Sequence, residues 1–396
     1  MALVALITGS SDETLWGLSS VDRITRQLAG VGINKLITAP EQAASGATVL
    51  LVNARYLFEL RTFQALLRHP GSSLVCPTDG QVAATYGDSG AVRSALLAMQ
   101  STTTHDDSDN VLRPADLEGY SEHLRKVEPP LLEPISADNH LELESRLYGN
   151  AYKGITDLVT KWWWPRPARV LVRLCAQQHI SPNAVTIFGL GLVIASTVLF
   201  AHGFYLLGLL SGWVMTLLDT VDGKLARVTV QSSRIGHVLD HGMDIIHPPI
   251  WYVYWGLGLA PMSDLLGFDL ESVLMAIVGG YVAGRGLEAL FHALGHCSMF
   301  SWRPFDAYFR LVTARRNPCL IILTTTTIVG RPDIGLLGVA LWTLASSALM
   351  AARLIYAAAI RAHSGPLESW LKDPETAAIQ YPRAFRTFSA TRGAYA

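Results

Sequence analysis

Charged residues are scarce in this sequence, and the marks of several protein classes are missing. Only 16% of the 396 residues are charged and the formal net charge at pH 7 is −1, with no long basic run that would suggest nucleic acid as a partner. The four cysteines form no CxxC pair, so neither a disulfide framework nor a zinc site is expected. The amino terminus also lacks the basic start and small-residue cleavage site of a secretory signal.

Hydrophobic residues are abundant but unevenly distributed. They make up 50% of the chain, and the mean hydropathy is +0.29. Charges are scattered through residues 1 to about 150, whereas residues 182–361 contain repeated apolar stretches long enough to cross a bilayer. The sequence therefore predicts a soluble domain followed by an integral membrane domain.

Residues 1–110 alternate short apolar runs with segments of helical spacing. This alternation predicts an α/β domain with a doubly wound, Rossmann-like sheet. The predicted strands are residues 3–8, 35–38 and 48–52, and the predicted helices are residues 21–30 and 60–67.

This domain resembles the front of a nucleotidyltransferase, where a strand and a Gly-rich loop hold a nucleotide triphosphate. The resemblance implies a loop with Arg and a following Lys, but residues 9–13 read GSSDE, and Asp12 and Glu13 would repel phosphates. Asn53 stands where the third strand would end in a metal-binding Asp. We interpret the domain as a shortened, inactive relative with a docking or regulatory role, in preference to an active cytidylyltransferase.

The segments between the domains have a different composition. Residues 101–110 are polar like a flexible linker, and we predict that the charged residues 111–151 wrap the soluble domain or lead on to the membrane. In residues 152–180, three consecutive tryptophans at 162–164 suit the bilayer interface, and arginines recur three and four residues apart opposite apolar positions. This pattern predicts an amphipathic helix on the membrane surface. Its arginines are Arg166, Arg169 and Arg173.

Residues 181–362 are predicted to form an all-α domain of six membrane spans. The spans are residues 182–201, 204–222, 237–259, 271–294, 317–330 and 334–360. Basic residues gather in the entry segment and in the second-to-third and fourth-to-fifth connections, whereas the opposite side carries only Arg331. By the positive-inside rule, both termini, including the tail 363–396, and the second-to-third connection face the cytoplasm, as in a bacterial inner membrane.

Four aspartates in two pairs dominate residues 218–244. The pairs Asp219/Asp222 and Asp240/Asp244 are three and four residues apart, so each pair lies on one face of a helix. Four carboxylates beside a membrane interior repel one another strongly, which makes a divalent cation the expected reason for their proximity. An all-oxygen cluster suits Mg²⁺, Mn²⁺ or Ca²⁺ rather than zinc.

The aspartates and the residues between them resemble the complete signature of the CDP-alcohol phosphotransferases, which are integral membrane enzymes of phospholipid synthesis. The intervening positions are Gly223, Ala226, Arg227 and Gly236. A single aspartate would be read as a solvated face or an N-cap, but all eight positions match at fixed separations. The resemblance implies transfer of a phosphoalcohol group from a CDP-linked donor to an acceptor hydroxyl, with release of CMP, and we also expect a homodimer.

The resemblance further implies the roles of individual residues. All four aspartates would bind two Mg²⁺ or Mn²⁺ ions, and Asp244 would also act as general base. Gly223 and Ala226 would let the nucleotide approach the backbone, and Gly236 would let helices pack closely. Arg227 can donate a planar fork to a phosphate or an aspartate. In the helix start Pro182-Asn183-x-x-Thr186, Asn183 and Thr186 match a segment that family members carry near the nucleotide site.

Three arginines outside the signature are candidates for an acceptor pocket. Arg285 lies inside a predicted span, where an arginine is costly, and Arg315 and Arg316 lie at the mouth of the fifth span. Together they could bind an anionic acceptor such as inositol phosphate or glycerol phosphate. Alternatively, Arg285 pairs with Glu288 or an aspartate and the other two face anionic headgroups. The histidines near the aspartates are interpreted as polar lining rather than ligands.

Two other functions are alternatives to CDP-alcohol phosphotransfer. Aspartate-rich prenyltransferases also have paired metal-binding motifs, but they have more spans and lack Gly-x-x-Ala-Arg between the pairs. A non-catalytic membrane scaffold would not need all four aspartates. The donor stays open between CDP-diacylglycerol and a soluble CDP-alcohol such as CDP-inositol, and the acceptor between polar and lipid alcohols.

Overall fold

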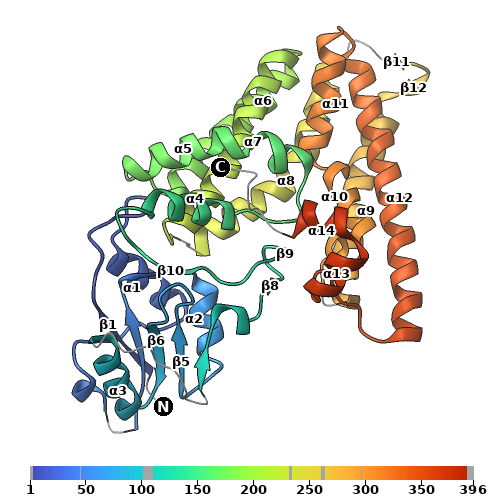
Figure 1. The fold of residues 1–396 in the computed structure, drawn as a ribbon. Helices are drawn as coiled ribbons and strands as arrows, with labels where there is room; N and C mark the ends of the chain where they lie inside the picture. The colour runs from blue at the N-terminus through green and yellow to red at the C-terminus, as the bar shows by residue number, and fades with distance from the viewer. Residues whose placement is uncertain are drawn as a thin grey trace.

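A computed structural model describes residues 3–44, 46–100, 110–231, 234–259, 264–295 and 297–389. Figure 1 shows an N-terminal sheet region at one end of the molecule and long helices at the other. Helices α6 (Pro182–Ala201) and α7 (Tyr205–Val228) lie above the sheet region in this view. Helices α9 (Leu270–Gly295) and α12 (Pro332–Ser364) run side by side at the right of the molecule.

The main sheet has six strands in the order β2-β1-β3-β6-β5-β7. Its first half is parallel, because β1 (Leu3–Thr8) pairs with β2 (Leu36–Ile37) and with β3 (Thr48–Asn53) in the same direction. The apolar runs thus predicted these three strands correctly.

The second half of the sheet departs from the doubly wound prediction. Strand β6 (Val82–Gly87) is antiparallel to both β3 and β5 (Ser72–Val75). Residues 76–81 are too few for a helical crossover, so β5 and β6 form a hairpin and must run in opposite directions. Strand β7 (Val111–Leu112) then adds in parallel to β5. The sheet is therefore mixed, with the predicted topology only in its first half.

Helices cover both faces of this sheet. Ile24 and Leu28 pack with Phe63 in one core cluster, and Val92 packs with Val49 in another on the opposite face. These residues come from α1 (Ser20–Gly30), α2 (Leu60–Leu66), α3 (Ser89–Gln100) and β3.

The segment predicted to be a linker also carries regular structure. Strand β10 (Leu132–Pro134) pairs antiparallel with β4 (Tyr56–Phe58), and β7 extends the main sheet. The segment also contains η2 (Pro114–Asp116), the hairpin of β8 (Tyr120–Ser121) and β9 (Lys126–Val127), and α4 (His140–Asn150). Residues 110–151 are thus joined to the sheet region by strand pairing. Of the predicted flexible segment 101–110, only Asn110 lies within the described residues.

Four helices of the second part are long and apolar enough to cross a membrane, which indicates an integral membrane protein. They are α6 (Pro182–Ala201), α7 (Tyr205–Val228), α9 (Leu270–Gly295) and α12 (Pro332–Ser364). Two more helices coincide with predicted spans, α8 (Arg234–Gly258) and α11 (Arg316–Ile328). The remaining elements are η1 (Pro40–Gln42), η3 (Val159–Trp163), α5 (Pro165–Gln177), β11 (Asp264–Leu265), β12 (Phe268–Asp269), η4 (Met299–Ser301), α10 (Pro304–Val312), α13 (Pro374–Gln380) and α14 (Pro382–Phe388).

Helix α5 lies where the surface helix was predicted, although it is shorter because a π-helical turn, η3, precedes it. Its Ala168 and Val172 are buried in the core cluster that includes Val221 of α7. Val170 and Leu174 are exposed, as are Trp162 and Trp163 just before the helix. A helix lying on a membrane would bury such apolar side chains in the interface, as the prediction requires.

Candidate active site

Helix α7 carries the first half of the aspartate motif, which we define as residues 219–244. The helix continues to Val228, so Asp219, Asp222 and Arg227 all lie on one continuous helix. This end is six residues beyond the predicted end of the second span at 222. Close packing positions the helix, since a Cβ on Gly208 would clash with Cε1 of Phe200 on α6.

Helix α8 carries the second half of the motif. Asp240, His237 and His241 lie on this helix, but their side chains fall outside the described residues. The side chain of Asp244 is described and is 43% exposed. His247 is buried against Trp251, with ring centroids 4.8 Å apart, and its Nδ1 lies 2.5 Å from Met243 O.

Arg316, at the start of α11, brings an aspartate of each pair together. Its Nη2 donates to Asp219 Oδ2 at 2.6 Å, and its Nη1 donates to Asp244 Oδ1 at 2.7 Å. A guanidinium has the planar fork needed to bind two carboxylates at once, and its charge offsets their repulsion. Three helices therefore meet at one charged cluster, although the sequence analysis had placed Arg316 with the acceptor.

Asp222 is held from the neighbouring helix α6. Its side chain is buried, and Thr186 Oγ1 donates to Asp222 Oδ2 at 2.6 Å. Ser181 caps the start of α6 by accepting from Ala184 N, which sets the beginning of the helix and hence the position of Thr186 one turn later. The contact supplies a physical reason for a hydroxyl at position 186.

The residues after Asp222 tie the motif to the segment before α5. Arg227 Nε donates to Ala151 O at 2.9 Å, and a Cβ on Gly223 would lie 3.1 Å from Arg227 Nη2. Lys224 is buried, with Nζ 3.9 Å from the ring centroid of Tyr152. Lys224 is one of the basic residues of the predicted second-to-third connection.

A cavity of about 520 Å³, which we call the motif cavity, opens beside Asp222. Its volume lies in the range of small-molecule sites. Seven of the predicted site residues line it: Asn183, Thr186, Asp222, Gly223, Ala226, Arg227 and Gly236. Asp219, one helical turn before Asp222, and Asp244 lie outside the lining and meet at Arg316 instead.

The opposite wall of the motif cavity comes from the N-terminal sheet region, which sequence reasoning did not foresee. Helix α1 contributes Arg23 and Gln27, and the segment around α2 contributes Glu59 and Arg61. Arg26 Nη1 also donates to Thr229 O at 2.9 Å, immediately after α7. The two predicted domains thus share this cavity.

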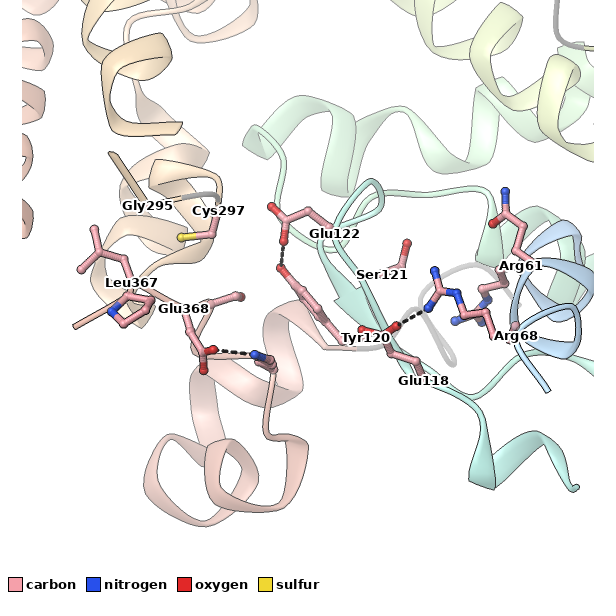
Figure 2. A pocket seen from close by; sticks show the side chains of 15 residues that line it. Arg61, Arg68, Glu118, Tyr120, Ser121, Glu122, Gly295, Cys297, Leu367 and Glu368 are labelled. Atoms are coloured by element: carbon pink, nitrogen blue, oxygen red, sulfur yellow. Dashed lines mark hydrogen bonds and ion pairs between the residues drawn. The ribbon is translucent and has the colours of Figure 1, made fainter. Parts of the chain in front are cut away.

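A second cavity of about 530 Å³ adjoins the first and shares Arg61, Gln64 and Ser121 with it. Figure 2 shows Arg61 and Arg68 on one side and Cys297 and Glu368 on the other. Ion pairs join Arg68 to Glu118 and Lys372 to Glu368 on its two sides. Its lining residues all lie outside the aspartate motif.

The other two candidate acceptor residues lie together but apart from Arg316. Arg285 Nη1 is 3.5 Å from Glu288 Oε2, and Arg315 forms an ion pair with the same carboxylate. Pairing with Glu288 was the alternative left open for Arg285. Tyr281, also on α9, donates to Ile245 O at 2.9 Å and so holds this helix beside Asp244.

The described carboxylates have the chemistry of a hard-cation site. Asp219, Asp222 and Asp244 offer only oxygen donors, which Mg²⁺ and Mn²⁺ favour. Among the side chains that the structure describes, no three His, Cys, Asp or Glu residues gather closely enough to hold a metal, and the Asp240 side chain is not one of them. Charge and donor type fit a divalent cation, with Arg316 supplying positive charge to two of the carboxylates.

Residues 179–291 match the family model of the CDP-alcohol phosphatidyltransferases. Cholinephosphotransferase 1 of Gallus gallus is 34% identical over 124 residues, which are 28% of this chain and 36% of that protein. The phosphatidylinositol phosphate synthase of Mycobacteroides abscessus is 32% identical over 112 residues, which are 26% of this chain and 50% of that protein. The chain thus spans about a third to a half of the length of these curated relatives.

Among solved structures, the phosphatidylinositol phosphate synthase (PgsA1) of Mycobacterium tuberculosis, in complex with manganese and citrate, overlaps with a TM-score of 0.35. The two are 20% identical, and the overlap covers 48% of this chain and 88% of that chain. The family match includes both aspartate pairs, Asn183 and Arg285, and it agrees with the resemblance read from the motif. Residues 179–291 are therefore a CDP-alcohol phosphatidyltransferase domain.

Proposed function

We propose that this chain transfers a phosphoalcohol group from a CDP-linked donor to an acceptor hydroxyl and releases CMP, in the synthesis of phospholipids. The observation that carries the proposal is the motif cavity, where seven predicted site residues from α6, α7 and α8 line one space of about 520 Å³. The family match of residues 179–291 supports the same chemistry. The enzyme is thus a transferase of substituted phosphate groups.

Asp219, Asp222, Asp240 and Asp244 are the residues that would hold two Mg²⁺ or Mn²⁺ ions. When bound, such ions neutralise a pyrophosphate and stabilise the charge on a leaving phosphate. Arg316 keeps Asp219 and Asp244 facing each other, and Thr186 orients Asp222. Asp244 is the most exposed of the three described carboxylates, which suits the role of a base that takes the proton of an acceptor hydroxyl.

The nucleotide part of the donor would lie against the cavity wall formed by Gly223 and Ala226. Side chains this small let a ligand approach the helix backbone closely. Asn183 and Arg227 line the same cavity and offer hydrogen-bond donors to a phosphate or a ribose.

The acceptor is proposed to be anionic, such as inositol phosphate or glycerol phosphate, with Arg285, Arg315 and Arg316 as its binding residues. Arg285 lies over the ring of Tyr281, which donates to Ile245 O beside Asp244, and Arg316 pairs with Asp244 itself; these contacts support the assignment. The competing role for Arg285 and Arg315 is structural, because both pair with Glu288. A soluble CDP-alcohol as donor is the second candidate within the same reaction class.

For the membrane arrangement, we propose six spans, with α8 and α11 added to the four apolar helices. The distribution of basic residues supports a cytoplasmic position for both termini and for the aspartate motif. A homodimer is proposed as the functional form. The domain boundaries proposed are residues 1–110, 111–151, 152–180, 181–362 and 363–396.

The N-terminal domain is proposed to lack nucleotidyltransferase activity. Asp12, Glu13 and Asn53 line a cavity beyond the ends of β1 and β3, where that activity would need basic residues. Among the described side chains that line it, only Arg55 supplies positive charge. A docking or regulatory role fits its position against α7.

The proposal is tested with the purified full-length chain in lipid vesicles. Candidate CDP-linked donors and alcohol acceptors are supplied with Mg²⁺ or Mn²⁺, and CMP release is measured together with the lipid product. We expect metal-dependent CMP release that stops when a chelator is added. CMP release that continues at the same rate in chelator would overturn the metal assignment. A properly folded protein inactive on every CDP-linked donor would favour the scaffold alternative.

A further inference from the structure

We infer that the N-terminal domain forms the outer wall of the donor site and that Arg23 and Gln27 on α1 bind the hydrogen-bonding edge of the donor's cytosine base. The inference rests on the proposed function for the identity of the donor. The residues that carry it lie outside the family match, which covers residues 179–291.

Both side chains are buried yet have unused hydrogen-bonding atoms. Arg23 and Gln27 are each 2% exposed, and both line the motif cavity. Within the described part of the chain, Arg23 Nε and Gln27 Oε1 have no hydrogen-bond partner. Buried polar atoms without partners are costly, so a ligand that supplies the missing partners would be favoured.

The orientation of Gln27 is set by its other contact. Its Nε2 donates to Phe58 O at 2.8 Å, so the amide cannot turn its nitrogen toward the cavity without losing that bond. The remaining atom, Oε1, can only accept. Gln27 therefore selects a ligand group that donates a hydrogen bond.

Arg23 offers the complementary atom from the same face of α1, since residues four apart on a helix are neighbours. Its Nη2 donates to Leu15 O at 2.7 Å, which leaves Nε–H as a donor. Burial, with a smaller contribution from Arg26, lowers the pKa of Arg23 to about 10. The guanidinium therefore stays charged at neutral pH.

Cytosine presents this pattern in reverse. Its exocyclic amine donates, and the adjacent ring nitrogen and carbonyl accept. Uracil has a carbonyl in place of the amine, so it would face Gln27 Oε1 with an acceptor. The pair Arg23 and Gln27 thus distinguishes a cytidine nucleotide from a uridine nucleotide.

The position of α1 suits the base rather than the phosphates. The phosphate end of the donor would lie at Asp222. Helix α1 contacts Thr229, directly after α7, through a hydrogen bond from Arg26. The seven residues from Asp222 to Thr229 correspond to a helix rise of about 10 Å. That separation is on the scale of a nucleoside extended from its phosphate.

The test measures inhibition of transfer by CMP and by UMP, using the full-length chain in vesicles. We expect the wild-type protein to bind CMP at least about tenfold more tightly than UMP, because UMP leaves Gln27 unpaired. Gln27→Met should weaken CMP by a similar factor and bring the ratio close to one. Gln42→Met, in the same domain but outside the cavity lining, should keep the wild-type ratio. An unchanged ratio in folded Gln27→Met would overturn the inference.

A second measurement needs neither a variant nor turnover. A cytidine nucleotide with a photoreactive azide on its base is cross-linked to the wild-type protein, and the modified peptide is identified. We expect modification within residues 20–30, and competition by CMP but not by UMP. Modification confined to residues 182–231 would overturn the inference. A protein that cross-links at residues 20–30 but transfers no phosphoalcohol would refute the proposed function alone.

Discussion

The motif cavity has two walls of different origin. Its membrane wall, on α6, α7 and α8, consists of residues at fixed spacing, such as Thr186, Asp222 and Arg227. Its soluble wall includes Arg23, Gln27 and Arg61, which belong to no recognisable motif. The membrane wall carries the groups suited to phosphoryl transfer, whereas Arg23, Gln27 and Arg61 on the soluble wall offer hydrogen bonds and positive charge. The difference suggests that reaction chemistry and donor selection reside in different parts of this chain.

The largest effect is expected when charge is removed from the membrane wall. Asp222→Asn, or Asp219→Asn, keeps the shape of the side chain but removes a charged oxygen ligand. We expect CMP release to fall by more than about 100-fold while the protein stays folded, because even partners of metal ligands contribute 10- to 100-fold. Asp138→Asn, on an exposed turn, is the control. Substantial turnover in both motif variants would contradict the metal assignment.

The acceptor arginines test whether binding groups also lie on the membrane side. If Arg285 and Arg315 bind an anionic acceptor, Arg→Ala should raise the acceptor KM by about 10- to 150-fold, corresponding to roughly 1.5–3 kcal/mol, with little change in the donor KM. If they serve only to hold Glu288, the melting temperature should fall and both substrates should be affected alike. Both Michaelis constants and thermal unfolding are measured on each variant. An unaltered acceptor KM would remove the acceptor role.

Arg316 connects the aspartates of two helices, so its loss should affect stability as well as rate. Arg316→Met leaves the carboxylates of Asp219 and Asp244 facing each other without their shared cation. Because these side chains are only partly buried, the loss should cost less than the roughly 3–5 kcal/mol typical of a fully buried pair. We expect a lower melting temperature that Mg²⁺ or Mn²⁺ partly restores, because a bound cation replaces the lost charge. If Arg316→Met were as stable as the wild-type protein in chelator, the bridge would be dispensable.

A smaller effect is expected at Thr186, which orients Asp222 rather than contacting the donor's phosphates. Thr186→Val keeps the shape and removes the hydroxyl that donates at 2.6 Å. The rate of CMP release should fall by about 10- to 100-fold. Thr197→Val is the matched control, since its hydroxyl bonds only to Val193 O on the same helix. Equal rates in the two variants would remove the orienting role.

The smallest effect is expected in an assay for nucleotidyltransferase activity of the N-terminal domain. Supplied with CTP and a phosphoalcohol, the full-length chain should form no CDP-alcohol, because Asp12 and Glu13 stand where phosphates would bind. Product is followed by nucleotide chromatography. CTP-dependent product would show that the N-terminal domain is catalytic as well.

Much of the fold follows from local patterns. The apolar runs predicted β1 and β3, and the helical spacing predicted α1 and α2, because these elements bury residues at their own periodicity. Strand direction in the second half of the sheet was not predictable in the same way. It depends on the short connection between β5 and β6, whose hairpin reversed the expected parallel order.

The proposed chemistry follows from the sequence alone, because the aspartates, Gly223 and Arg227 stand at fixed separations along two helices. Two features appear only in the folded chain: Arg316 joins Asp219 to Asp244, and Arg23 and Gln27 line the cavity beside Asp222. Helical periodicity relates residues three or four apart. It carries no information about contacts between residues 97 or 203 positions apart, such as Asp219 with Arg316 and Arg26 with Thr229.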